Sequence, residues 1–171
     1  MLLVRRMNMF KEEKSLQEKV KQIKKRWAGK RDSVGNRLIS KLLKDYRSDD
    51  PLTKAILGDD LEFIQTYCIP KPSFFENEGP LFCFEAACLC ASEKIAIFLL
   101  ENGKIEIQEA KHTVGYALST GDIDFALKIA QLMKAKGQRN IGGALVYVFG
   151  NYDNFEKVRE VFEESRNLEL D

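Results

Sequence analysis

Histidine is scarce in this chain, and its scarcity narrows the chemistry that the protein can perform. The 171 residues include a single His, His112, together with one Trp and four Pro. His112 stands apart from any cluster of cysteines or carboxylates, and such a lone histidine is more often a packing or surface residue than a catalyst. Nucleophilic catalysis by a Ser-His-Asp or Cys-His arrangement is therefore not expected.

Glycine-rich phosphate loops are missing as well. Neither G-x-G-x-x-G nor G-x-x-x-x-G-K occurs, and the doublet Gly142-Gly143 falls where a helix is expected to start. Acidic neighbours such as Asp59 and Asp60 precede an expected helix, where capping and the helix dipole account for them. We expect no enzyme activity, no cofactor and no metal site.

The four cysteines do not form the pattern of a disulfide framework or a zinc site. Cys68, Cys83, Cys88 and Cys90 lie in or beside apolar helical runs and lack paired Cys-x-x-Cys spacing with histidine. We interpret them as buried, reduced thiols. The sequence also has no N-x-S/T sequon and no apolar run near the ~20 residues of a membrane span.

The opening ten residues, MLLVRRMNMF, are apolar with two arginines. This apolar block is shorter than that of a secretory signal, and Glu12 and Glu13 come early for a transit peptide. Reduced thiols are typical of the cytosol or nucleus, and these features together favour a protein of the cytoplasm over an organellar or secreted one.

Charge is almost balanced overall but is divided unevenly along the chain. The net charge is +1, yet residues 1–50 carry fifteen Lys or Arg against seven Asp or Glu, a net of +8. Residues 51–171 carry twelve against nineteen, a net of −7. An uneven charge distribution of this kind bears on which partners the protein attracts and says little about its fold. We assign residues 1–48 to a basic N-terminal helical arm and residues 49–171 to a helical-repeat domain.

The arm is expected to form two helices, over residues 9–28 and 34–47. An apolar stripe of Leu16, Val20, Ile23 and Trp27 steps by four, three and four residues, which is the spacing of one helix face. Ser15 and Glu18 have the spacing of a capping box, or they lie inside a helix that begins nearer Asn8. The place of Trp27 on the stripe predicts that it is buried.

From Asp50 onward the pattern changes to short paired helices. Four breaks, at Asp59, Ala91, Gly121 and Gly150, lie 32, 30 and 29 residues apart. The expected helices cover residues 51–57 and 61–68, then 86–91 and 92–102, then 110–119 and 123–135, then 141–149 and 154–165. We therefore predict an all-α protein, an α-solenoid of about four stacked helix-turn-helix repeats with an N-terminal two-helix extension.

Local signals place the ends of these helices. Asp50 followed by Pro51 is an N-cap with a first-turn proline, and Asp59 with Glu62 has capping-box spacing. Ser92 is the expected N-cap of its helix, and Gly103 is the expected left-handed stop after it. The segment 69–79, IPKPSFFENEG, holds two prolines and a glycine and is expected to be a loop.

Several of these units resemble the ankyrin-repeat family. That family has Thr-Pro-Leu-His before a pair of alanines, then Gly, then Leu-Glu-Val-Val, then Leu-Leu with a closing Gly. The resemblance covers residues 50–135 and rests on Asp50-Pro51-Leu52-Thr53-Lys54-Ala55, Asp59-Asp60-Leu61-Glu62-Phe63-Ile64, Ala87-Cys88, Leu99-Leu100-Glu101-Asn102-Gly103, and Thr113-Val114 with Gly121-Asp122-Ile123-Asp124-Phe125. It implies stacked helical hairpins that recognise protein partners on a concave face.

The chain also departs from the ankyrin pattern. No unit keeps the histidine of the Thr-Pro-Leu-His turn, and the repeat spacing is below the family's ~33 residues. Residues 136–140 are too few for the family's projecting β-hairpin. The last two units resemble pentatricopeptide repeats as well, a family of helical hairpins that bind RNA.

Two surfaces are candidates for binding. One is the concave face of the repeats with the aromatic pair Phe74 and Phe75, which either covers the neighbouring hairpin or is an exposed anchor. The other is the basic arm, whose charges either form a solvated helix face, fold back onto the acidic body, or bind an acidic protein or nucleic acid. The candidate partner-binding residues of the arm are Lys21, Lys24, Lys25, Arg26, Lys30, Arg31 and Arg37.

These surfaces lead to two hypotheses of function. The first is a non-catalytic, ankyrin-like protein-protein interaction module or adaptor. The alternative is an RNA- or ribosome-associated helical-repeat protein that binds through the basic N-terminal arm. Neither the partner nor the oligomeric state follows from the sequence.

Overall fold

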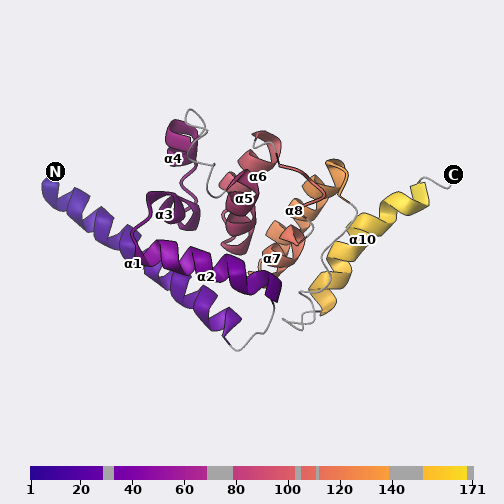
Figure 1. Ribbon diagram of the computed structural model, residues 1–171, viewed down its shortest axis with the longest axis horizontal. Coiled ribbons are helices and arrows are strands. Elements are labelled where there is room, and N and C mark those ends of the chain that lie inside the picture. Colours follow the sequence, from indigo (N-terminus) through magenta and orange to yellow (C-terminus); the bar gives the residue numbers. More distant parts are fainter. Residues whose placement is uncertain (29–32, 69–78, 103–104, 111, 139–151, 169–171) are drawn as a thin grey trace.

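Every regular element in the described part of the chain is a helix, as the sequence predicts (Figure 1). The structure is a computed structural model that describes residues 1–28, 33–68, 79–102, 105–110, 112–138 and 152–168. The helix expected at 141–149 and the break at Gly150 lie outside these residues, as does nearly all of the loop expected at 69–79. No helix among the described residues is long and apolar enough to cross a membrane.

The first two helices lie along one side of the shorter helices α3, α5 and α7 (Figure 1). Helix α1 spans Leu2–Trp27 and α2 spans Ser33–Arg47. Because α1 begins at Leu2, Ser15 lies well inside it and does not form a capping box with Glu18. The expected apolar stripe is confirmed, since Val20, Ile23 and Trp27 are 3–6% exposed.

Helices α3 to α8 form consecutive pairs in two layers. One layer contains α3, α5 and α7, in which α5 contacts both α3 and α7, and the other contains α4, α6 and α8 (Figure 1). The bounds are α3 Pro51–Leu57, α4 Leu61–Phe63 with a π-helical turn η1 Ile64–Cys68, α5 Gly79–Leu89, α6 Glu93–Asn102, α7 Thr113–Ser119, α8 Ile123–Ala135 and α10 Tyr152–Leu168.

Two helix starts differ from the sequence prediction. Helix α5 begins at Gly79, seven residues before the expected Ala86, because Pro80 is compatible with a first helical turn. Helix α7 begins at Thr113, three residues after the expected Ala110. Residues 107–110 and His112 are in turns, and Glu109 N–H donates to Glu106 O while Thr113 N–H donates to Ala110 O.

The three described repeat breaks share one backbone geometry. Asp59, Ala91 and Gly121 all have positive φ, at 52°, 54° and 81°. At the first two, the next residue closes a Schellman turn, with Asp60 N–H donating to Ala55 O at 2.9 Å and Ser92 N–H to Ala87 O at 2.8 Å. The regular spacing of these breaks in the sequence therefore corresponds to a repeated left-handed turn.

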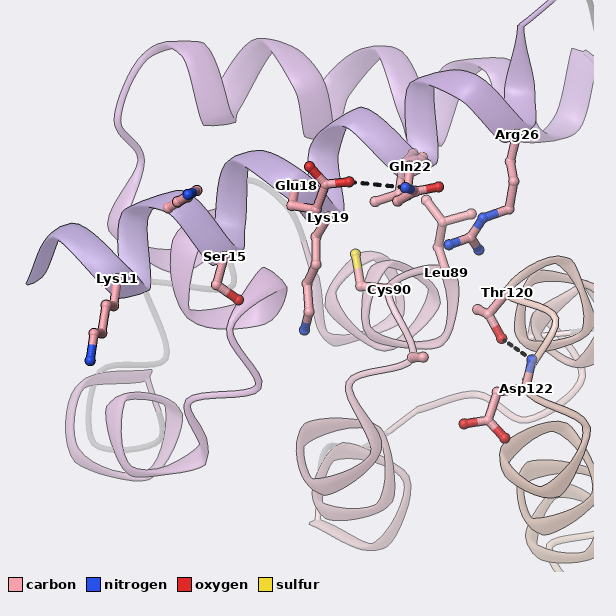
Figure 2. Close-up of a pocket in the computed structure, with 13 residues that line it drawn as sticks. Lys11, Ser15, Glu18, Lys19, Gln22, Arg26, Leu89, Cys90, Thr120 and Asp122 are labelled. Atoms are coloured by element: carbon pink, nitrogen blue, oxygen red, sulfur yellow. Dashed lines mark hydrogen bonds between the residues drawn. The ribbon is translucent and has the colours of Figure 1, made fainter. Parts of the chain in front are cut away.

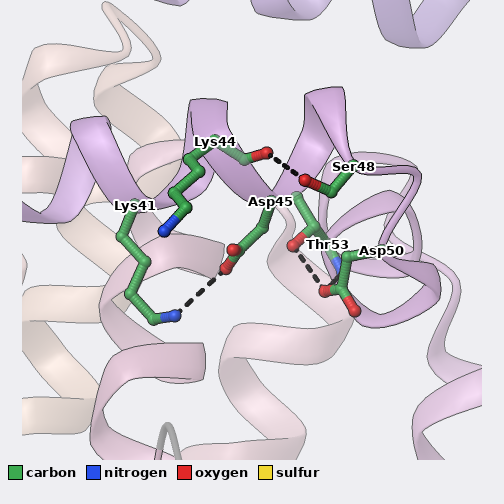
Figure 3. A network of polar contacts seen from close by, with 6 residues as sticks. All are labelled: Lys41, Lys44, Asp45, Ser48, Asp50 and Thr53. Atoms are coloured by element: carbon green, nitrogen blue, oxygen red, sulfur yellow. Dashed lines mark hydrogen bonds and ion pairs between the residues drawn. The ribbon is translucent and has the colours of Figure 1, made fainter.

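Aspartates cap the helices that follow most of these turns. Asp50 accepts hydrogen bonds from Thr53 N–H and Thr53 Oγ1 at 3.0 and 2.7 Å, which confirms the expected N-cap of α3 (Figure 3). Asp122 accepts from Phe125 N–H at 3.1 Å at the start of α8. Asp60, and not the expected Asp59, caps α4 through Phe63 N–H at 3.1 Å.

Helix α6 is capped from the preceding pair. The expected cap, Ser92, is buried, and its hydroxyl donates instead to Ile56 O near the end of α3. The carboxylate of Asp59 takes the cap position and accepts from Lys94 N–H at 3.2 Å and Ile95 N–H at 3.0 Å. Because Ser92 and Asp59 bridge the α3–α4 and α5–α6 turns in opposite directions, they fix how the two pairs stack.

One hydrophobic core runs through the described chain. It joins residues of α1 and α2, such as Trp27 and Leu42, to the buried faces of α3, α5, α6, α7 and α8, and to Val158 of α10. Cys83, Cys88 and Cys90 are buried, as the sequence predicts. The arm therefore packs against the repeats through its apolar stripe.

Candidate functional site

An open groove of about 610 Å³ separates α1 from the turns that follow α5 and α7 (Figure 2). Helix α1 supplies one wall, the end of α5 supplies part of the floor, and the α7–α8 turn supplies the far wall. The lining residues are Lys11, Lys14, Ser15, Glu18, Lys19, Gln22, Ile23, Arg26, Leu89, Cys90, Ala91, Thr120 and Asp122.

Two cations of α1 hold this helix across the ends of the repeats. Lys19 Nζ donates to Leu57 O at the C-terminus of α3 at 2.6 Å, and Arg26 Nη1 donates to Ser119 O at the C-terminus of α7 at 3.2 Å. A spacing of seven residues places both on one side of α1. A positive side chain at a helix C-terminus donates hydrogen bonds to unpaired carbonyls and is attracted by the negative end of the helix dipole. Lys19 and Arg26 therefore have a structural role.

The floor of the groove is apolar and chemically inert. Ile23, Leu89 and Cys90 are 3%, 1% and 8% exposed, and Figure 2 shows the Cys90 sulfur directed toward α1. Burial raises the pKa of the Cys90 thiol to about 12, although the charges of Lys19 and Arg26 act in the other direction. Burial therefore favours the neutral form of the Cys90 thiol.

The far wall is polar and internally bonded. Thr120 Oγ1 donates to Ala117 O at 2.7 Å and accepts from Asp122 N–H at 3.2 Å (Figure 2). The Asp122 side chain is exposed at the rim while it caps α8. On the α1 side, Lys11 and Lys14 are exposed, and Glu18 accepts a hydrogen bond from Gln22 at 3.0 Å. The rim therefore carries the exposed lysines and Glu18 on the α1 side and the Asp122 carboxylate on the other.

The groove combines an apolar floor with a polar rim. The groove is lined by no histidine, its thiol is neutral, and its one serine, Ser15, lies on the exposed surface of α1. In the described ranges, no group of three or more His, Cys, Asp or Glu side chains could hold a metal ion. An apolar floor beside lysines fits a chain segment that offers an apolar side chain and carboxylates.

The structure separates the basic residues that the sequence grouped together. Of the predicted partner-binding residues that the structure describes, only Arg26 lines the groove, where it is half-buried against Ser119. Burial lowers the pKa of Arg26 from the usual arginine value. Lys21, Lys24 and Lys25 are exposed on α1 outside the groove, and Arg37 is exposed on α2. The remaining candidates, Lys30, Arg31, Phe74 and Phe75, lie outside the described residues.

Several groove residues were not identified from the sequence. Ser15, Glu18 and Gln22 have the three- and four-residue spacing of one helix side, which could have indicated a shared surface beside the apolar stripe. The sequence pattern at Thr120 and Asp122 predicts a turn and a helix cap, but it does not predict a binding surface. No local sequence pattern predicts that Cys90 lies under α1, because that contact depends on how α1 packs on the later helices.

No family model, curated protein or solved structure matches this chain.

Proposed function

We propose that this chain is a non-catalytic helical-repeat protein, an ankyrin-like α-solenoid, that acts in the cytoplasm as a protein-protein interaction module or adaptor. Support for the repeat architecture comes from the left-handed turns at Asp59, Ala91 and Gly121, and from the contacts of α5 with both α3 and α7. Stacked units of this kind present extended surfaces to partners.

The groove under α1 is the observation that carries the binding proposal. It combines a buried apolar floor at Leu89 and Cys90 with the exposed amines of Lys11 and Lys14. An apolar anchor with flanking carboxylates would satisfy both features, since charge-assisted contacts orient a segment while the anchor excludes water. The partner we propose is therefore a protein segment that has Asp or Glu beside a large apolar residue.

A steric variant tests this proposal without changing charge. Ser15 is exposed and points into the groove from α1 (Figure 2), so Ser15→Trp should fill the site. Peptides selected from a random displayed library against the full chain should carry an apolar residue flanked by acids. Their affinity, measured by calorimetry, should fall about tenfold or more with Ser15→Trp, because the anchor and its ionic contacts are lost together.

The matched control is Gln17→Trp. Gln17 is also exposed on α1 but does not line the groove, so this variant adds the same indole with no obstruction. Selected peptides should bind Gln17→Trp like the wild type. If both variants bind the peptides equally well, or if selection gives no acidic-apolar preference, the groove is not the binding site that we propose.

A second candidate function is binding of RNA, which the exposed lysines of α1 support. Lys21, Lys24 and Lys25 are exposed and form no ion pair with any residue that the structure describes. Trp27, the aromatic nearest to them in α1, is buried, which leaves no stacking platform beside these lysines on that helix. RNA binding predicts co-purifying nucleic acid whose absorbance at ~260 nm disappears when the three lysines are changed to glutamate.

A further inference from the structure

The outer face of α1 carries an apolar half followed by a lysine half. Residues spaced by four, three, four, seven and four positions fall within an arc of about 60° on a helix. These residues are Leu3, Met7, Phe10, Lys14, Lys21 and Lys25, which we call the outer stripe. The stripe faces away from the buried residues Val20, Ile23 and Trp27 on the opposite part of the same helix.

The apolar half of the outer stripe is exposed to an unusual degree. Leu3, Met7 and Phe10 are 73%, 53% and 74% exposed, and their neighbours Leu2, Val4 and Met9 are 60–77% exposed. This end of α1 projects beyond α3 and α4, so the repeats do not cover it (Figure 1). A contiguous apolar surface of this kind on a folded protein marks a site of interaction.

Charge on this segment has a single sign. Residues 1–11 contain Arg5, Arg6 and Lys11 and no acidic residue. Further along α1, Lys14, Lys21, Lys24 and Lys25 are exposed, and Glu18 is the one carboxylate beside the stripe. The partner of this face must therefore accept apolar side chains at one end and cations along its whole length.

We infer that the outer stripe of α1 binds an anionic phospholipid surface, with α1 lying in the plane of the interface. Leu3, Met7 and Phe10 would enter the boundary between headgroups and acyl chains, while the lysines meet acidic headgroups. Lysine side chains suit this role because their aliphatic stems lie on apolar surface and their amines stay in water. The outer stripe shares Lys14 with the groove, and its other five residues do not line the groove.

Other partners fit the outer stripe less well. If two copies paired through it, a parallel arrangement would oppose lysines to lysines, and an antiparallel one would oppose lysines to Leu3 and Phe10. A nucleic acid would neutralise the lysines but would leave the apolar half in water. An anionic bilayer offers both kinds of contact in one surface.

The test is sedimentation of the full chain with phosphatidylcholine vesicles, with or without about 30 mol% phosphatidylserine, in ~0.1 M NaCl. The wild type should sediment with the serine-containing vesicles and much less with phosphatidylcholine alone. The double variant Leu3→Ser/Phe10→Ser and the triple variant Lys14→Gln/Lys21→Gln/Lys25→Gln should each weaken partition about tenfold or more.

Matched controls separate the stripe from charge in general. Lys94→Gln/Lys136→Gln removes exposed lysines of the repeats and should leave partition unchanged. All substituted side chains are exposed, so the circular dichroism melts should superimpose on that of the wild type. In Phe10→Trp, emission should shift to shorter wavelength when serine-containing vesicles are added, because Trp27, the only native tryptophan, is already buried.

Three outcomes would overturn the inference. The first is no sedimentation with serine-containing vesicles. The second is binding that survives Leu3→Ser/Phe10→Ser, which would indicate a purely electrostatic surface for polyanions such as RNA. The third is a wild-type dimer in analytical ultracentrifugation that becomes a monomer in Leu3→Ser/Phe10→Ser, which would assign the stripe to a second copy of the chain.

Discussion

Glu85 of α5 has a partly buried carboxyl group, and this burial disfavours its ionised form. It is only partly exposed, and burial raises its pKa from 4.5 to about 7. The folded state therefore holds this proton at pH values where the unfolded chain has released it. By linkage, the stability that Glu85 contributes is complete below about pH 4.5 and is lost as pH rises through about 7.

Glu85→Gln should therefore change the pH dependence of stability in a defined direction. At pH 8 the variant should be more stable than the wild type by roughly 1–2 kcal/mol, after allowance for partial solvent screening, because it has no charge to bury. At pH 4.5 the two proteins should differ little. Urea unfolding at a series of pH values measures this difference.

Glu160→Gln provides the control for that measurement. Glu160 is an exposed residue of α10, so its neutralisation should change the free energy of unfolding by less than ~0.5 kcal/mol at either pH. A Glu85→Gln variant that tracks the wild type from pH 4.5 to 8 would contradict the raised pKa.

At the scale of elements, the repeated turn is the feature that organises the chain. Ala91 and Gly121 occupy equivalent left-handed positions, at φ 54° and 81°, after α5 and α7. A left-handed conformation is costly for a residue with a Cβ and free of that cost for glycine. The two turns therefore differ in strain although their geometry is similar.

Substitutions at these two positions should have opposite effects. Ala91→Gly should increase the free energy of unfolding by about 0.5–1 kcal/mol, because it relieves the left-handed strain. Gly121→Ala should decrease the free energy of unfolding by about 1 kcal/mol, because alanine is strained in the left-handed conformation. The added Cβ would not be crowded, since no atom lies within 4 Å of it. Guanidinium unfolding measures both.

Changes of the same sign at the two positions would contradict the shared turn geometry. Ala91→Gly also removes a methyl group that packs against the core, which offsets part of its gain. For that reason the expected gain is smaller than the expected loss at Gly121.

At the scale of the whole molecule, the arm and the helices that follow it share one hydrophobic core. Val20, Ile23 and Trp27 are 3–6% exposed in the shared core. Burial of three such side chains contributes about 5–9 kcal/mol, which is comparable with the total stability of a typical domain. Lys19 and Arg26 add contacts to the C-termini of α3 and α7.

Two deletions should separate the packed part of α1 from its projecting part. Removal of residues 2–10, whose apolar side chains are exposed, should shift the melting temperature by less than about 3 °C. Removal of residues 2–27 should lower it by more than about 10 °C or abolish the cooperative transition. Thermal melts followed by circular dichroism distinguish these outcomes.

An unchanged melt after the longer deletion would show that the repeats fold without the arm. The expected loss also affects the test of RNA binding. Because deletion of the arm removes core residues, substitutions at Lys21, Lys24 and Lys25 are the appropriate variants.

Much of the secondary structure is readable from short-range sequence patterns. The spacing of Leu16, Val20, Ile23 and Trp27 identifies the buried face of α1, and Asp50-Pro51 identifies the start of α3. The breaks at Asp59, Ala91 and Gly121 mark the turns. These features follow from the helical period and from the conformational preferences of single residues, so they need no knowledge of distant contacts.

The helix caps show what short-range sequence patterns cannot predict. Ser92 has the sequence of an N-cap, yet its hydroxyl reaches Ile56 O and Asp59 caps α6 in its place. Either residue satisfies the local rule. The choice between them depends on how the α3–α4 turn lies against α6, which is a contact between residues more than thirty positions apart.

The sequence by itself determined that the chain is helical, where most of its turns fall, and that its basic charge is concentrated in the arm. Only the tertiary structure decided which of the described basic residues of the arm contact the helices that follow. Arg26 meets the end of α7, while Lys21 and Lys25 remain in solvent on the other side of the same helix. The sequence shows how many charges α1 carries but not which of them face the rest of the protein. That is decided by the packing of the apolar stripe, which turns one side of α1 toward the other helices and leaves the opposite side in solvent.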